Sequence, residues 1–339
     1  MPRPDLQLLG IAYRRIPVLS IGRDVYLDTR LILQKLEVLY PPSAAHPPLS
    51  AKTGEHAAIE RLLSRYTTDG GLFTSGSRLI PADAPVMRDP RYLRDRAEFV
   101  GAAVRDNKKS QTTTASSSSP MSPEALAGAR PEALAEIRDA AELLETTLLA
   151  DGREWVLKTP GPTLADIEAV WVLHWVVRMP GALPADVVGP RQFPKVFAWI
   201  ERFRGAVEKT TRKSEGEAVG SSSGGGGSSG EPKSLSGEEA ARVILGAPFA
   251  ELAGEEDPVD EKDPVAVAQG LKQGAKVRLW PTDSGSFHKD SGVLVSFKKG
   301  EVVIETRGAN GDGEALVKLH APRHGFRVRR IVEDGESKL

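Results

Sequence analysis

A change of periodicity within residues 13–37 constrains the fold more than any other feature of this sequence. Two short apolar runs, at residues 16–19 and 25–27, are separated by a turn that contains Gly22. This arrangement predicts an antiparallel hairpin. After Asp28 the apolar residues change to helical spacing, which predicts a helix that begins near Thr29. Asp or Thr is a normal N-cap there, because its side-chain oxygen accepts a hydrogen bond from an unpaired backbone N–H.

These elements, in this order, could hold a small peptide. Pro17 opens the first strand, and a proline belongs at a strand edge or start because it lacks an N–H. If the bond before Pro17 is cis, the backbone of Ile16 faces outward and could pair with an extended peptide. The helix start offers N–H groups to a carboxylate, and Asp28 offers a charge to an ammonium group. A plain hairpin followed by a capped helix explains the same residues, and this stretch alone does not decide.

The stretch resembles the glutathione-binding half of the thioredoxin-like N-terminal domain of glutathione transferases. The resemblance rests on Ile16-Pro17, on Asp28-Thr29 and on the helix that follows them. It implies that Ile16 holds the cysteinyl backbone of glutathione and that Asp28 and Thr29 hold its γ-glutamyl end. The expected site for glutathione, as co-substrate, therefore consists of Arg15, Ile16, Pro17, Asp28 and Thr29.

One part of the family pattern is absent from the sequence. A transferase N-terminal domain begins with a strand, a helix and a second strand, and its first strand–helix turn carries the catalytic Tyr, Ser or Cys. Met1 falls where the second helix region of that pattern would begin. We therefore expect a partial, N-terminally truncated domain over residues 1–40. The resemblance names no catalytic residue in this chain.

Residues 52–210 read as an all-helical domain. Apolar stripes in residues 55–66, 91–104 and 132–149 predict helices. Thr163 and Asp166 stand three apart before an apolar run, which predicts a capping box. A similar box opens the central helix of the helical transferase domain, and residues 193–199 resemble the last helix of that domain. We interpret the box as structural, and we expect a disordered Ser/Thr-rich insertion at residues 106–122.

The C-terminal third begins with a linker. Its Gly/Ser composition predicts a flexible segment over residues 211–236. A short helix and five short strands then predict a small β barrel or meander within residues 237–339. Similar tails occur in some fungal transferase-like proteins, with the His-x-Pro-Arg-x-Gly-Phe pattern that stands here at residues 320–326. The expected fold is an α+β multidomain one: a partial thioredoxin-like domain, an all-α transferase-type domain and a small all-β tail.

Composition excludes several classes of function. The chain has 339 residues, a formal net charge of −1 and no cysteine. It therefore contains no disulfide, thiolate zinc site or cysteine nucleophile. The near-zero charge makes nucleic acid an unexpected partner, although Lys and Arg outnumber Asp and Glu by four from Val265 onward. No apolar run is long enough to span a membrane, and we expect a cytoplasmic protein.

We predict no metal site from the histidines. His174 lies in an apolar run without a second ligand at suitable spacing, which favours a core histidine. His320 and His324 are four apart, but a proline and a glycine between them argue against a helix.

Two functions follow from the resemblance. The first is a fungal glutathione transferase-like protein, in which the thiolate of glutathione attacks a small electrophile and a hydrogen-bond donor lowers the thiol pKa. The sequence supplies candidates for binding but no donor. The alternative is a non-catalytic interaction or scaffolding protein, a possible homodimer whose β tail binds a protein partner. Turnover of a generic electrophile would argue against the alternative.

Overall fold

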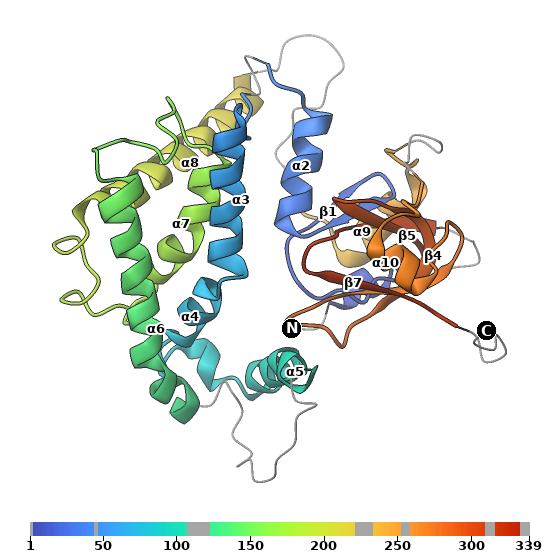
Figure 1. The fold of residues 1–339 in the computed structure, drawn as a ribbon, viewed down its shortest axis with the longest axis horizontal. Coiled ribbons are helices and arrows are strands. Elements are labelled where there is room, and N and C mark those ends of the chain that lie inside the picture. Colours follow the sequence, from blue (N-terminus) through green and yellow to red (C-terminus); the bar gives the residue numbers. More distant parts are fainter. Residues whose placement is uncertain are drawn as a thin grey trace. The chain divides into compact units, whose positions relative to one another are not determined.

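The computed structural model describes residues 3–43, 47–106, 123–220, 233–251, 258–308 and 316–332 (Figure 1). The chain divides into two compact units. The sheet unit comprises Met1–Tyr40, Pro90–Pro120 and Ser234–Leu339, and the helical unit comprises Pro41–Asp89 and Met121–Lys233. Residues 107–122 of the expected insertion and residues 221–232 of the expected linker lie outside the described part.

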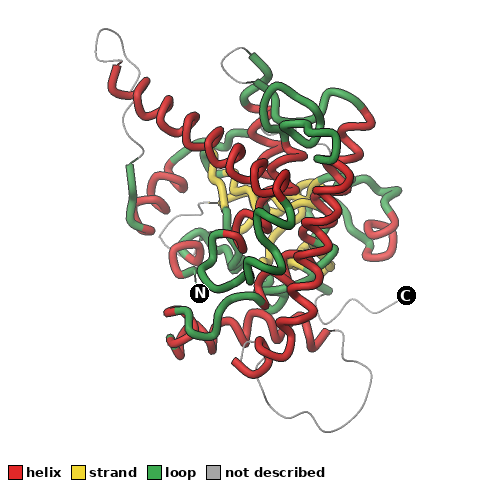
Figure 2. Tube along the Cα trace, turned by 90° about the vertical axis from the view of Figure 1, so that its left-hand side faces the viewer, coloured by secondary structure: helices red, strands yellow, loops and turns green. Residues whose placement is uncertain are grey.

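The sheet unit is built on one seven-stranded sheet with the strand order β1-β2-β6-β5-β4-β3-β7. Figure 2 shows strands in yellow and helices in red. Its strands are β1 (Val18–Ile21), β2 (Asp24–Leu27), β3 (Lys276–Pro281), β4 (Asp290–Phe297), β5 (Glu301–Arg307), β6 (Leu316–Pro322) and β7 (Phe326–Arg330). Its helices are α1 (Pro4–Gln7), α2 (Thr29–Leu39), α5 (Pro90–Asp106), α9 (Gly237–Gly246) and α10 (Pro264–Gln269). The expected hairpin, the helix at Thr29 and the five tail strands are all present. The tail strands form a meander of β3 to β6, and β7 returns to pair with β3.

The N-terminal hairpin and the tail belong to the same sheet, whereas the sequence suggested two separate domains. Strand β2 pairs in parallel with β6, and Tyr26 lies opposite His320. All four residues of β2 are buried, so this strand needs covered faces and a partner on each edge, which the hairpin alone cannot supply. Leu9, Ile11 and Val25 share one apolar core with the tail strands. Gly10 also lies against β5, because a Cβ there would lie 1.8 Å from the carbonyl oxygen of Arg307.

Helix α5 also belongs to the sheet unit, although its sequence pattern suggested the helical domain. Asp95 of this helix forms an ion pair with Arg14, which is itself buried. The carbonyl oxygen of Phe99 accepts a hydrogen bond of 3.1 Å from the backbone N–H of Gly285. Both contacts join segments that are far apart in the chain, so a local helical pattern could not assign the helix to a domain.

The helical unit consists of helices packed around α7 (Leu164–Val177). The others are α3 (Gly54–Thr68), α4 (Leu72–Arg78), α6 (Pro123–Leu143), α8 (Pro194–Gly220), the 3₁₀ turn η1 (Pro85–Arg88) and the π-helical turn η2 (Leu144–Leu148). Figure 1 shows α3 beside α7. The Thr163–Asp166 capping box at the start of α7 is confirmed. Residues 211–220, expected in the linker, are helical because α8 continues to Gly220.

No helix within the described ranges is both long enough and apolar enough to cross a lipid bilayer.

Candidate functional site

The structure brings four of the five expected glutathione residues to one end of the sheet. The Ile16–Pro17 peptide bond is cis, and the side chain of Ile16 is 70 % exposed. Val18 lies opposite Leu27, so one further step of the same register puts Pro17 beside Asp28. Thr29 is the first residue of α2. Among the described strands, β1 has only β2 as a neighbour, so its outer edge is open at this point.

Asp28 has the most unusual backbone in this region. It is one of two non-glycine residues with positive φ among those described, with φ 72° and ψ 133°. Its side chain caps α2 by accepting a hydrogen bond of 3.0 Å from the backbone N–H of Arg30. A non-glycine residue held in such a region costs about 1–3 kcal/mol and is found more often at functional sites. Asp28 as a whole is half-buried.

Arg15 differs from the other four residues because its guanidinium group is already engaged. The group donates hydrogen bonds of 3.0 and 2.7 Å to the carbonyl oxygen of Ser284 and forms an ion pair with Asp283. A ligand at the hairpin would have to compete with these partners for Arg15.

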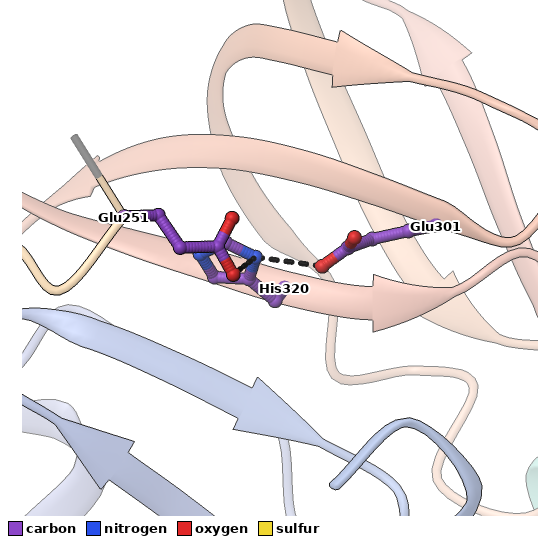
Figure 3. Close-up of side chains that lie close together, drawn as sticks. All are labelled: Glu251, Glu301 and His320. Atoms are coloured by element: carbon purple, nitrogen blue, oxygen red, sulfur yellow. Dashed lines mark hydrogen bonds and ion pairs between the residues drawn. The ribbon is translucent and has the colours of Figure 1, made fainter. Parts of the chain in front are cut away.

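A second cluster of polar groups lies in the same unit and was not expected from the sequence. His320 of β6 is fully buried, and both of its ring nitrogens face carboxylates. Nδ1 lies 2.7 Å from an oxygen of Glu301, and Nε2 lies 3.0 Å from an oxygen of Asp24. Figure 3 shows Glu251 and Glu301 reaching His320 from two directions. Lys35 of α2 forms ion pairs with Glu251 and, at 3.1 Å, with Glu301.

The cluster favours a protonated histidine. Ionised carboxylates only accept hydrogen bonds, so both ring nitrogens must donate, as they do in the imidazolium ion. Burial alone would lower the pKa of His320, but the hydrogen bonds to Asp24 and Glu301 raise it above its ordinary value. Burial alone would raise the pKa of Glu301 and of Asp24, but the hydrogen bond and charge of His320 lower both. The three groups therefore form a buried ion triad.

A pocket of about 450 Å³ opens beside this triad. It is lined by Leu31, Lys35 and Val38 of α2 and by Glu251, Gly300 and Glu301, among others. This volume lies in the range of small-molecule sites. The pocket has an apolar wall from α2 and a charged floor, on which Lys35 lies between two carboxylates.

Glu251, Glu301 and His320 have the composition of a metal site, since their ligand atoms lie within 4.8 Å of one another. However, the ammonium group of Lys35 lies against both glutamates, where it supplies the positive charge that a cation would bring. A histidine that binds a metal ion must also have a neutral imidazole ring. The two carboxylates beside His320 instead favour its protonated form. The residues present therefore do not fit a metal ion.

Some signals of this cluster were present in the sequence. Lys35 falls on the apolar stripe of its helix, and Asp24 directly precedes the buried run at residues 25–27. A charged residue at a buried position requires a partner. The partner of Asp24 could not be predicted from the sequence, because Asp24 and His320 are 296 positions apart.

Asp290 is a third buried titratable group of the sheet unit. Its carboxylate accepts a hydrogen bond of 2.6 Å from the backbone N–H of Ala12 and a second from that of Tyr13, and this fastens the N-terminal segment to β4. Burial raises the pKa of Asp290 to about 7, and the two N–H donors only partly oppose this effect.

We expect Asp290→Asn to stabilise the protein above pH 7. An acid whose pKa rises on folding contributes stability below its unfolded pKa, near 4, and loses it as the pH rises through the folded pKa. The amide oxygen of Asn can accept the hydrogen bond from Ala12 without a charge. The variant should therefore exceed wild type by roughly 2–4 kcal/mol at pH 8 and match it near pH 4, in urea denaturation at each pH. Glu261→Gln, at an exposed position, is the control. Parallel pH profiles of Asp290→Asn and wild type would contradict the assignment.

Comparisons with known proteins bear on the fold. A family model described as a domain of unknown function (DUF7962) matches residues 75–212. No curated protein matches. The crystal structure of a GST-like protein from Pseudomonas syringae is similar with a TM-score of 0.57 and 22% identity, over 98% of this chain and 86% of that chain. The β-etherase LigF from Sphingobium sp. strain SYK-6 gives a TM-score of 0.38 and 19% identity, over 57% of this chain and 78% of that chain. The likeness to the Pseudomonas protein shows a GST-like fold.

Proposed function

We propose that this protein binds glutathione where β1 meets the start of α2, and that it acts as a glutathione transferase-like protein on a small electrophile. The observation that carries the proposal is the conformation of Asp28. Asp28 is half-buried, and its backbone has a positive φ. It is the N-cap of α2 and lies beside the open edge of the sheet.

The cysteinyl backbone and the γ-glutamyl end of glutathione each have matching groups in this arrangement. The open edge of β1 and the backbone of Ile16 offer N–H and C=O groups to an extended peptide, as in strand addition. The first turn of α2, which begins at Thr29, offers backbone N–H groups and a positive dipole end to the γ-glutamyl carboxylate. Asp28 offers a negative charge to the γ-glutamyl ammonium group. The GST-like fold supports the same assignment.

The proposal assigns binding roles and leaves thiol activation without an assigned residue. A transferase forms a bond from the thiolate sulfur to the electrophile, while the thiol proton leaves to a base or to water. A homodimer belongs to the same proposal. The alternative of a scaffolding protein with a separate tail module has less support, because strands of the tail share a sheet with the hairpin.

Asp28→Asn is expected to weaken glutathione binding by about tenfold or more. A hydrogen bond or ion pair to a charged group contributes about 1.5–3 kcal/mol, and 1.4 kcal/mol corresponds to a factor of ten in affinity. Asn keeps the N-cap and tolerates positive φ, whereas Ala would lose the cap at a cost of about 0.5–2 kcal/mol. The measurement is a calorimetric titration of glutathione into wild type and variant.

Glu37→Gln is the matched control, since it removes the same charge from the same helix near its other end. It should leave the affinity within about twofold of wild type, as expected for a charge more than one Debye length away. Equal affinities of Asp28→Asn and wild type would refute the assigned role of Asp28. Absence of binding by the wild-type chain would refute the proposed function.

A further inference from the structure

The sheet unit has a strongly basic face on strands β3 and β7, and the function proposed above does not use it. Arg278 of β3 lies directly opposite Arg329 of β7, and Trp280 lies directly opposite Arg327. These four residues alternate with buried ones along their strands and therefore share one face. Leu279 lies opposite Asp290 of β4, so one further step of this register puts Lys289 beside Trp280, on the side away from Arg327. We call Arg278, Lys289, Arg327 and Arg329 the basic face.

The charges of the basic face are not neutralised within the described part of the chain. All four side chains are exposed, and none of them forms an ion pair with another described residue. Directly opposite residues on antiparallel strands have Cβ atoms about 4.5–5.5 Å apart, and like charges in that position are destabilising. The pair Arg278–Arg329 therefore lowers the stability of the sheet unless an anion binds between them.

The basic face surrounds a pocket of about 460 Å³. Arg278, Arg327, Arg329 and Lys289 all line it, together with Trp280. The indole of Trp280 is only 6 % exposed, and the ammonium group of Lys289 lies 4.5 Å from its ring centroid. The ring of Trp280 therefore contacts the ammonium group of Lys289 and offers no open surface on which a base could stack.

We propose that this pocket binds a small molecule that carries two or more phosphate groups. Guanidinium groups form paired hydrogen bonds with phosphate oxygens, and two arginines on adjacent strands can hold one phosphate between them. Lys289 and Arg327 flank Trp280 in the neighbouring row and can hold a second phosphate. The pocket volume is that of a small-molecule site.

A nucleic acid fits the basic face less well. Binding of single strands normally combines a long basic groove with aromatic rings on which successive bases stack. Here the indole is covered, the chain has a net charge of −1, and the cations occupy a short patch on two strands and the start of a third. A compact, highly charged ligand matches these features better than an extended one.

The test is a calorimetric titration of inorganic tripolyphosphate into the full-length chain at about 50 mM salt, where surface charges are weakly screened. Wild type is expected to bind. Arg278→Gln and Arg329→Gln should each weaken binding at least tenfold, and the double variant should abolish it. The control is Arg307→Gln, an exposed arginine of β5 that does not line the pocket; it should change the affinity less than twofold. Urea denaturation verifies that each variant is folded.

Two further titrations separate the possible ligands. Inorganic monophosphate should bind at least tenfold more weakly than tripolyphosphate, because it reaches only one pair of cations. A single-stranded oligonucleotide with the same number of phosphates as tripolyphosphate should bind no more tightly than tripolyphosphate. Tighter binding of the oligonucleotide, or equal affinities of wild type and the double variant for tripolyphosphate, would overturn the proposal.

Discussion

Asp166→Ala is expected to destabilise the helical unit by about 4 kcal/mol or more. The side chain is fully buried and its carboxylate accepts four hydrogen bonds. Oδ1 accepts from the backbone N–H of Val156 at 2.9 Å and from the indole N–H of Trp199 at 3.0 Å. Oδ2 accepts from the backbone N–H of Thr163 at 2.9 Å and from its hydroxyl at 3.1 Å. A hydrogen bond to a charged group contributes about 1.5–3 kcal/mol, and alanine would leave several buried donors unpaired.

Two variants calibrate this measurement, which is urea denaturation followed by tryptophan fluorescence. Thr163→Ala removes one hydroxyl of the capping box and should cost about 0.5–2 kcal/mol. Asp186→Ala removes an exposed carboxylate of the same unit and should change the free energy of unfolding by less than about 0.5 kcal/mol. If Asp166→Ala lowers the free energy of unfolding by less than about 1 kcal/mol, the four hydrogen bonds do not hold the loop that precedes α7 against α8.

The sequence revealed Asp166 because a capping box is local. Thr163 and Asp166 are three residues apart, and the apolar run that follows them identifies a helix start without tertiary information. The same holds for the hairpin, for α2 and for the tail strands, whose boundaries follow from alternation and turn residues. The further contacts of Asp166 with Val156 and Trp199 come from other elements and carried no signal in the sequence.

The assembly of the sheet unit could not be predicted in this way. Strand β2 pairs with β6, which lies almost 300 residues later in the chain. Two parallel strands are not joined by a short hairpin turn, so no turn sequence indicates that they pair. The basic face illustrates the same limit. Alternation puts Arg327 and Arg329 on one side of their strand, but only the pairing with β3 brings Arg278 opposite Arg329. The sequence therefore showed only a modest excess of positive charge in the tail, whereas the structure gathers four of its cations on one face of the sheet.

His320→Ala is expected to destabilise the sheet unit by about 3–5 kcal/mol, because it leaves Asp24 and Glu301 buried without the positive charge between them. The effect should depend on pH. The raised pKa of His320 gives stability that is complete below its unfolded pKa, near 6.5, and is lost as the pH rises through the folded value. The lowered pKa values of Asp24 and Glu301 give stability that is lost as the pH falls below about 4. The difference between wild type and variant should therefore be largest near pH 6, in urea denaturation at several pH values.

Two further variants separate the loss of charge from the loss of a side chain. His324→Ala removes an exposed histidine four residues away and should have little effect. The triple variant Asp24→Asn, His320→Leu, Glu301→Gln removes all three charges together and should recover much of the stability that His320→Ala loses. Replacing a complete buried ion set is often neutral, whereas removing one member leaves an unpaired charge. If the triple variant is no more stable than His320→Ala, packing around the imidazole ring rather than its charge stabilises the junction of β2, β5 and β6.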